Sequence, residues 1–100
     1  MKTLETLKAA RKKIADPNSW TTGSYAKDVE GNELSAGWNP TAVCWCAVGA
    51  LEAVTKRCVT DYICRQLLPG SDLVTVWNDT HSHAEVLAAF DAAITKLEGR

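Results

Sequence analysis

The chain has 100 residues, of which 46% are hydrophobic and 23% charged, a composition typical of one globular domain and not of a disordered segment. Its formal net charge is −1, which excludes the basic field that binding to a nucleic acid polymer or an acidic membrane requires. The N-terminus has no secretory signal, and the longest apolar run is shorter than the about 20 residues that span a bilayer. We therefore expect a single soluble domain over residues 1–100, located in the cytoplasm.

The first part of the chain is expected to be a helix followed by a long loop. Residues 3–15 carry apolar side chains at helical spacing, which predicts an amphipathic helix. Residues 17–39 are rich in glycine and short polar side chains, so this segment is predicted to be irregular. Within it, residues 24–36 are predicted to include a short β-hairpin around Gly31-Asn32, a dipeptide that favours a tight turn. Loops of this length in compact domains usually serve binding or pack under their own side chains.

The second predicted helix, residues 39–57, is the most apolar part of the chain. Asn39 suits its N-cap and Pro40 its first helical position. From Ala42 to Val54, eleven of thirteen residues are apolar, which predicts a helix buried on most of its circumference. Gly49 costs about 1 kcal/mol of helix propensity relative to alanine. We therefore expect another element to pack closely against the backbone at this position.

The remainder of the chain is predicted to contain two helices and one extended segment. A short third helix is expected at residues 60–68, ended by the Pro-Gly pair at 69–70. Residues 73–77 are β-branched and aromatic, which predicts an extended segment. The last helix begins after Ser82, with Glu85 completing a capping box.

Together these elements predict a mainly α fold. About four helices are expected to pack around the buried central helix at residues 39–57. A minor β-hairpin or extended component is expected from residues 24–36 and 73–77. We see no internal repeat and no low-complexity segment.

Several motifs from Trp20 onward carry a resemblance to a known family. They are Trp20…Asp28-x-x-Gly31, Ala42-x-x-Trp45-Cys46-x-x-Gly49-Ala50-Leu51, Trp77-Asn78-Asp79 and Glu85-Val86-Leu87. This pattern resembles a family of small bacterial and phage proteins that is catalogued as a domain of unknown function. The resemblance implies a shared fold and suggests a phage-associated setting, and it implies no activity.

The sequence predicts a ligand site between two connecting segments. Trp77 is a candidate stacking surface, and Asp79 is a candidate acceptor of hydrogen bonds from a base, sugar or amide. The same turn can instead serve only to cap the last helix, and the four tryptophans can instead fill the core. The candidate ligand-binding residues, drawn from this turn and from the long loop, are Trp20, Asp28, Trp38, Trp77, Asn78 and Asp79. The leading hypothesis is a non-catalytic module without cofactor or metal, which binds a small flat polar ligand such as a nucleotide.

Two other functions stay open. One is a protein–protein interaction module, or a homodimer, anchored by exposed tryptophans. The other is a small cysteine-dependent hydrolase with Cys46 as nucleophile and His83 or His81 as base. In a helix that begins at residue 39, Cys46 lies two turns inside among apolar neighbours, which favours a buried, inert thiol. A zinc site is not expected, because residues two apart on a helix, such as Cys44 and Cys46, point about 200° apart.

Overall fold

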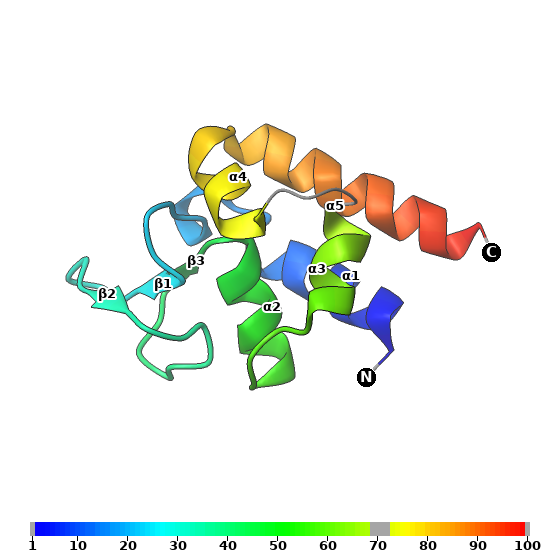
Figure 1. Ribbon diagram of the computed structural model, residues 1–100. Helices are drawn as coiled ribbons and strands as arrows, with labels where there is room; N and C mark the ends of the chain where they lie inside the picture. The colour runs from blue at the N-terminus through cyan, green and yellow to red at the C-terminus, as the bar shows by residue number, and fades with distance from the viewer. Residues whose placement is uncertain (1, 69–72, 100) are drawn as a thin grey trace.

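The computed structural model describes residues 2–68 and 73–99. These residues form five α-helices, one short 3-10 helix and three short strands (Figure 1). In chain order they are α1 (Thr3–Lys13), η1 (Pro17–Ser19), β1 (Ala26–Lys27), β2 (Glu33–Leu34), β3 (Cys44–Trp45), α2 (Ala47–Thr55), α3 (Asp61–Leu67), α4 (Val74–Thr80) and α5 (His83–Glu98). The predicted mainly α fold with a minor β component is confirmed. No helix within these residues is long and apolar enough to cross a membrane.

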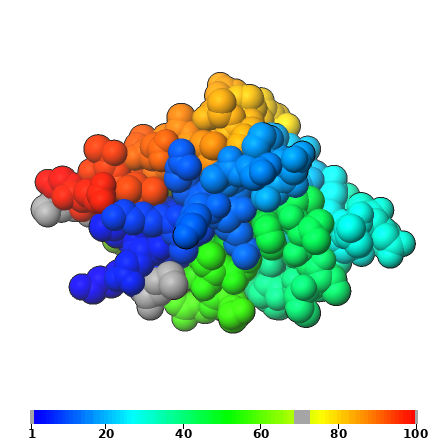
Figure 2. Space-filling view, turned by 180° about the vertical axis from the view of Figure 1, so that it is seen from behind, coloured from blue at the N-terminus to red at the C-terminus, as the bar shows by residue number. Residues whose placement is uncertain are grey.

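The core forms where α1, α2 and α5 meet. Helix α1 packs against both α2 and α5, while α4 packs against α2 and α3 against α5. Leu7 of α1, Leu51 of α2 and Phe90 of α5 are completely buried there. Figure 2 shows α1 and the C-terminal half of α5 side by side on the rear face of the molecule. The prediction of a buried second helix is thus confirmed.

That helix begins later than the sequence predicts, which corrects the range 39–57. Helix α2 starts at Ala47, and the Cys46 thiol caps it by accepting a hydrogen bond from the Gly49 amide at 3.3 Å. Asn39 caps a local turn instead, since its side-chain oxygen accepts from the Thr41 amide at 2.9 Å. The residues before Cys46 form strand β3, because a short apolar run fits a buried strand as well as a helix and β1 offers it a partner.

The three strands form one small antiparallel sheet in the order β2-β1-β3. Ala26 at its centre pairs with Leu34 on one side and with Trp45 on the other. The predicted hairpin in residues 24–36 is confirmed in a shorter form, and Gly31 in its turn has a φ of 83°. This positive φ is the backbone conformation for which glycine is suited.

Residues 73–77, predicted to be extended, lie mostly in helix α4, so this prediction is wrong. Val74 and Asn78 are four residues apart and both are buried, as expected for one face of a helix that packs on α2. Tertiary packing here overrides the β propensity of the local sequence.

The predicted N-caps of the third helix and of the last helix are confirmed. The Thr60 hydroxyl accepts from the Ile63 amide at the start of α3. Ser82 and Glu85 form the predicted capping box at the start of α5. The predicted end of the third helix at residues 69–70 lies outside the described residues.

Two glycines let the long loop approach the central helix backbone to backbone. A Cβ on Gly49 would lie 1.7 Å from the Tyr25 carbonyl oxygen, and a Cβ on Gly37 would lie 1.9 Å from the Gly49 carbonyl oxygen. Neither position has room for a side chain. The close approach predicted at Gly49 is confirmed, and it fixes the segment at residues 23–25 over the first turn of α2.

Candidate functional site

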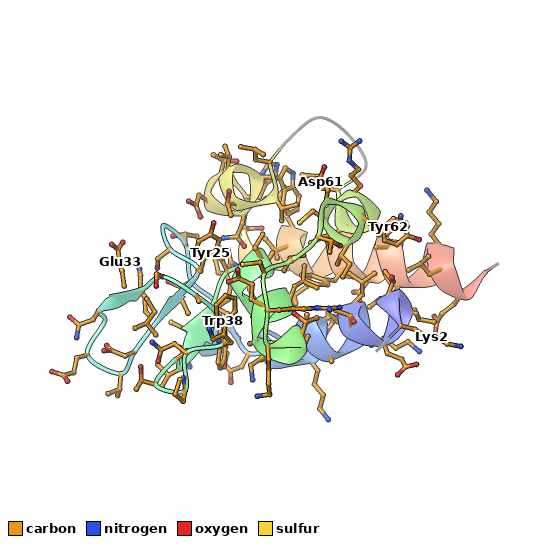
Figure 3. The ribbon with its side chains drawn as sticks, turned by 60° about the horizontal axis from the view of Figure 1, so that its bottom comes forward. Lys2, Tyr25, Glu33, Trp38, Asp61 and Tyr62 are labelled. Atoms are coloured by element: carbon orange, nitrogen blue, oxygen red, sulfur yellow. The ribbon has the colours of Figure 1, made fainter. Side chains whose placement is uncertain are left out.

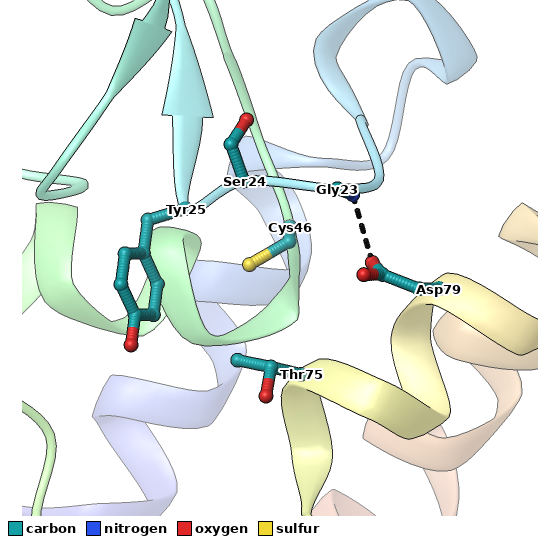
Figure 4. Close-up of a pocket in the computed structure, with 6 residues that line it drawn as sticks. All are labelled: Gly23, Ser24, Tyr25, Cys46, Thr75 and Asp79. Atoms are coloured by element: carbon teal, nitrogen blue, oxygen red, sulfur yellow. Dashed lines mark hydrogen bonds between the residues drawn. The ribbon is translucent and has the colours of Figure 1, made fainter.

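A pocket of about 180 Å³ opens between the loop segment at residues 23–25 and helix α4. Its lining residues come from the loop, the N-cap of α2 and α4, and they are Gly23, Ser24, Tyr25, Cys46, Thr75 and Asp79. Tyr25 and Asp79 stand on opposite sides of the pocket, with Cys46 between them (Figure 4). The loop reaches this position because it runs beside β3, where the Thr21 amide donates to the Trp45 carbonyl at 3.0 Å.

Asp79 supplies the one charged side chain of the lining set. Its Oδ1 accepts from the Gly23 amide at 2.9 Å and from the Asn78 side-chain amide at 3.2 Å. Gly23 reaches it from a left-handed turn with a φ of 82°. No described residue donates a hydrogen bond to Oδ2. The carboxylate is therefore held in place through one oxygen while the other keeps its capacity to accept.

Asn78 connects the three segments that surround the pocket. Its Oδ1 accepts from the Trp20 indole at 2.8 Å and from the Ala47 amide at 3.0 Å. Its Nδ2 donates to the Thr21 carbonyl at 3.1 Å and to Asp79. These four bonds use both donors and both acceptor positions of a carboxamide, and the side chain is completely buried. Asn78 thus positions Asp79, and its own amide has no capacity left for a ligand.

Cys46 forms the inner part of the pocket as a neutral thiol. It is 2% exposed, and this burial raises its pKa to about 11, although the hydrogen bond from Gly49 acts in the opposite direction. A thiol with this pKa is almost entirely protonated at neutral pH. The sequence placed Cys46 inside a helix, and the structure places it at the N-cap. The buried environment that the sequence predicts is confirmed.

The structure does not bring either histidine together with Cys46. His83 Nε2 lies 2.6 Å from the Ile14 carbonyl oxygen, and its ring lies against Trp20 with centroids 5.5 Å apart. His81 stacks on Trp77 with centroids 4.3 Å apart. Neither histidine lines the pocket. The residues at 2–68 and 73–99 contain no group of three or more His, Cys, Asp or Glu side chains that could hold a metal ion.

The six candidate residues from the sequence lie in four places. Trp20, Asn78 and Asp79 form one hydrogen-bonded group at the pocket. Trp77 packs against the core and His81 instead of lining the pocket. Asp28 lies in the hairpin turn, where it accepts from the amides of Glu30 and Asn32.

The sixth candidate, Trp38, is 42% exposed and also lies outside the pocket lining. The other three tryptophans pack partly buried against the core.

Sequence reasoning missed four of the lining residues. Thr75 was hidden by the wrong prediction of an extended segment. In helix α4 it lies one turn before Asp79 and next to it on the same face, whereas an extended chain would carry the two residues much farther apart. Gly23, Ser24 and Tyr25 lie in a loop whose path is set by distant contacts. A usable signal was present at Gly23, because an isolated glycine between polar loop residues often marks a turn with positive φ.

No curated protein and no solved structure matches the chain. Residues 1–96 match the family of unknown function DUF6197, in agreement with the resemblance that the sequence motifs carry. The chain therefore belongs to DUF6197, a family of unknown function.

Proposed function

We propose that this protein is a non-catalytic binding module whose ligand is a small polar molecule held between the loop at residues 23–25 and helix α4. The observation that carries the proposal is the Asp79 carboxylate, fixed through Oδ1 by the Gly23 amide at the mouth of a pocket. A convergent polar group beside an aromatic surface is the usual composition of a ligand site. The cytoplasmic location and the phage-associated setting are part of this proposal and rest on the sequence alone.

The size of the pocket limits the ligand. Its volume of about 180 Å³ is below the roughly 300–1,000 Å³ that is common for pockets of drug-sized ligands. A nucleotide, the first candidate from the sequence, would place only its base inside. Its phosphates would remain outside, because the lining has no Lys, Arg or His side chain to receive them.

The environment of Cys46 supports binding over cysteine-dependent hydrolysis. A nucleophilic thiol needs a low pKa or an adjacent base. Burial raises the pKa of Cys46 to about 11, and the lining set contains no histidine.

Chemical-shift mapping by ¹H–¹⁵N NMR tests the proposal. A panel of polar molecules small enough for the pocket, with cationic, neutral and anionic members, is titrated into the protein. We expect at least one member to shift the amides of Gly23, Ser24 and Thr75 in a saturable way. Thr75→Trp, which fills the pocket, should abolish these shifts. Val76→Trp, at the neighbouring position that is 58% exposed and outside the lining, is the matched control. Shifts that map elsewhere, or that persist in Thr75→Trp, would contradict the proposal.

A protein–protein interaction module is the second candidate. Exposed aromatic side chains favour it, namely Trp38 at 42% and Tyr62 at 56% exposure. Figure 3 shows that they come from different elements, Trp38 from the loop beside α2 and Tyr62 from α3. Multi-angle light scattering tests the homodimer form of this candidate. A dimer that Trp38→Ala converts to a monomer would support it, whereas a monomeric wild-type protein would exclude it.

A further inference from the structure

We propose that the part of the ligand that the pocket holds is a small organic cation of the guanidinium, amidinium or primary ammonium class. This inference rests on the proposed binding function and specifies the chemistry that the same site recognises. It is carried by the charge of the lining residues, by the direction of their hydrogen bonds and by the aromatic ring opposite the carboxylate.

The charge of the lining is negative. Among the six lining residues Asp79 is acidic and none is basic, so the lining carries a formal charge of −1. An anion in this space would face the carboxylate without a compensating cation. A cation would meet the opposite charge within contact distance, where the attraction between unit charges is strongest.

The free carboxylate oxygen of Asp79 is the strongest hydrogen-bonding group that the pocket offers to a ligand. The Gly23 amide already donates to Asp79, and the Ser24 hydroxyl already donates to the Ala26 carbonyl at 3.2 Å. The hydroxyls of Tyr25 and Thr75 can donate as well as accept, whereas an ionised carboxylate only accepts. Asp79 Oδ2 therefore selects a ligand that is rich in donors, and guanidinium and ammonium groups have donors only.

The side of the pocket opposite Asp79 is aromatic. Tyr25 lines this side, and the residue is 38% exposed (Figure 4). A cation within about 6 Å of an aromatic centroid is attracted by the negative charge on the ring face. The thiol of Cys46 between the two walls carries no charge that would compete. A flat guanidinium group could thus donate hydrogen bonds from its edge to Asp79 and stack its face on the Tyr25 ring.

Three probes of similar size and different charge test the inference, at constant ionic strength and with the ¹H–¹⁵N spectrum as readout. They are methylguanidinium, N-methylurea and acetate. We expect methylguanidinium to shift the amides of Gly23, Ser24 and Asp79, with N-methylurea binding about tenfold more weakly because it lacks the charge. Acetate should leave these amides unchanged.

Asp79→Asn removes the charge and keeps an oxygen that can accept from the Gly23 amide. It should weaken methylguanidinium binding about tenfold and leave N-methylurea binding nearly unchanged. Asp61→Asn removes the same charge from an exposed position on α3 and should have no effect. Should Asp79→Asn fail to give a folded spectrum, Tyr25→Leu tests the aromatic wall, with an expected loss of about two- to fivefold for methylguanidinium alone.

The outcomes separate the inference from the function beneath it. Stronger binding of N-methylurea or acetate than of methylguanidinium overturns the inference and leaves a ligand site in place. If none of the three probes shifts the pocket amides but another member of the polar panel does, the inference alone fails; if no member of the panel shifts them, the proposed function fails as well. A blocked arginine, N-acetyl-arginine methylamide, presents the same group on a peptide. If the blocked arginine binds about tenfold more tightly than methylguanidinium, the ligand is still a cation. The site would then recognise an arginine side chain of a partner protein instead of a free small molecule.

Discussion

At the scale of single residues, the Asn78 carboxamide joins α4 to the loop at residues 20–21 and to the first turn of α2. Buried polar groups of this kind are costly to leave without a partner. The side chain makes the position of Asp79 depend on the folded core, and through Asp79 it also fixes the loop at Gly23.

Asn78→Ala is expected to destabilise the protein strongly. It leaves the Trp20 indole, the Ala47 amide and the Thr21 carbonyl without their partner, at about 1–3 kcal/mol for each group that stays dry. We expect the free energy of unfolding in urea to fall by about 3 kcal/mol or more. Asn18→Ala, at an exposed position in η1, should change it by less than about 0.5 kcal/mol. Equal stabilities of the two variants would contradict the role of Asn78.

Glu52 is predicted to make stability depend on pH. The residue is 6% exposed, and its carboxylate accepts from the Gly37 amide at 2.9 Å. Burial raises its pKa above the ordinary value of 4.5, although the Gly37 bond opposes this shift. The charged form is thus disfavoured in the folded state. The free energy of unfolding therefore decreases as the pH rises from the pKa of Glu52 in the unfolded chain to its raised pKa in the folded protein. Above that range the decrease is complete and stays constant.

Glu52→Gln keeps an acceptor for Gly37 and removes this loss. We expect the variant to gain stability relative to the wild type between pH 4 and neutral pH, measured by urea denaturation at a series of pH values. Glu85→Gln provides a control of opposite sign, because hydrogen bonds from Ser82 lower the pKa of Glu85. This second variant should lose stability relative to the wild type as the pH rises from the lowered folded pKa to the unfolded value of 4.5, which is below the range in which Glu52→Gln gains it. Parallel curves for Glu52→Gln and the wild type would disprove the assignment.

Thiol reactivity follows the burial of each cysteine. Cys46 is buried with a pKa raised to about 11, whereas Cys58 is exposed. Iodoacetamide reacts with the accessible thiolate, so at neutral pH we expect peptide mapping to find Cys58 modified well before Cys46. Modification of Cys46 at the rate of Cys58 would reopen the hydrolase hypothesis.

At the scale of elements, the contact between the loop and α2 decides where the site forms. The backbone of Tyr25 passes directly over Gly49, and the backbone of Gly49 lies directly over Gly37. The indole of Trp45 fastens the same region by donating to the Gly37 carbonyl at 3.0 Å. The loop is therefore anchored to α2 through contacts of its own backbone.

Gly49→Ala tests this contact. The new methyl group would lie 1.7 Å from the Tyr25 carbonyl oxygen, so the backbone must separate. Overpacking of this kind costs about 1–3 kcal/mol or more, despite the higher helix propensity of alanine. Gly99→Ala is the matched control, since a Cβ at Gly99 would lie 3.5 Å from the Thr95 carbonyl oxygen, an ordinary van der Waals distance. Thermal unfolding should show a lower Tm for Gly49→Ala only. An unchanged Tm would mean that the loop is not packed on the helix.

Sequence patterns predict these elements where local chemistry determines them. The N-cap at Thr60 and the capping box at Ser82 depend on neighbouring residues, and both are confirmed. The start of α2 and the conformation of residues 74–77 depend on which distant element offers a partner. The local pattern of apolar residues carries no information about that partner, so the start of α2 and the conformation of residues 74–77 were predicted wrongly.

At the scale of the whole molecule, the pocket lies where the loop, the central helix and α4 meet. The segments that form it are far apart in the chain, since Gly23 and Asp79, which are joined by a hydrogen bond, are separated by 56 residues. From the sequence, the turn at Asn78-Asp79 and the long loop were predicted to face each other, and the structure does place them together. Which loop residues line the pocket was not predictable, because it depends on the backbone contact at Gly49 and on the helical conformation of α4.

The central claim is that the pocket between Tyr25 and Asp79 receives the ligand. Intermolecular nuclear Overhauser effects between methylguanidinium and the protein test it most directly, because they report proximity between individual protons. The account predicts effects from the methyl protons of the probe to the Tyr25 ring and the Thr75 methyl group. Effects to Trp38 or Tyr62 in their place would show that the probe binds the exposed aromatic surface, and that the pocket is not the site.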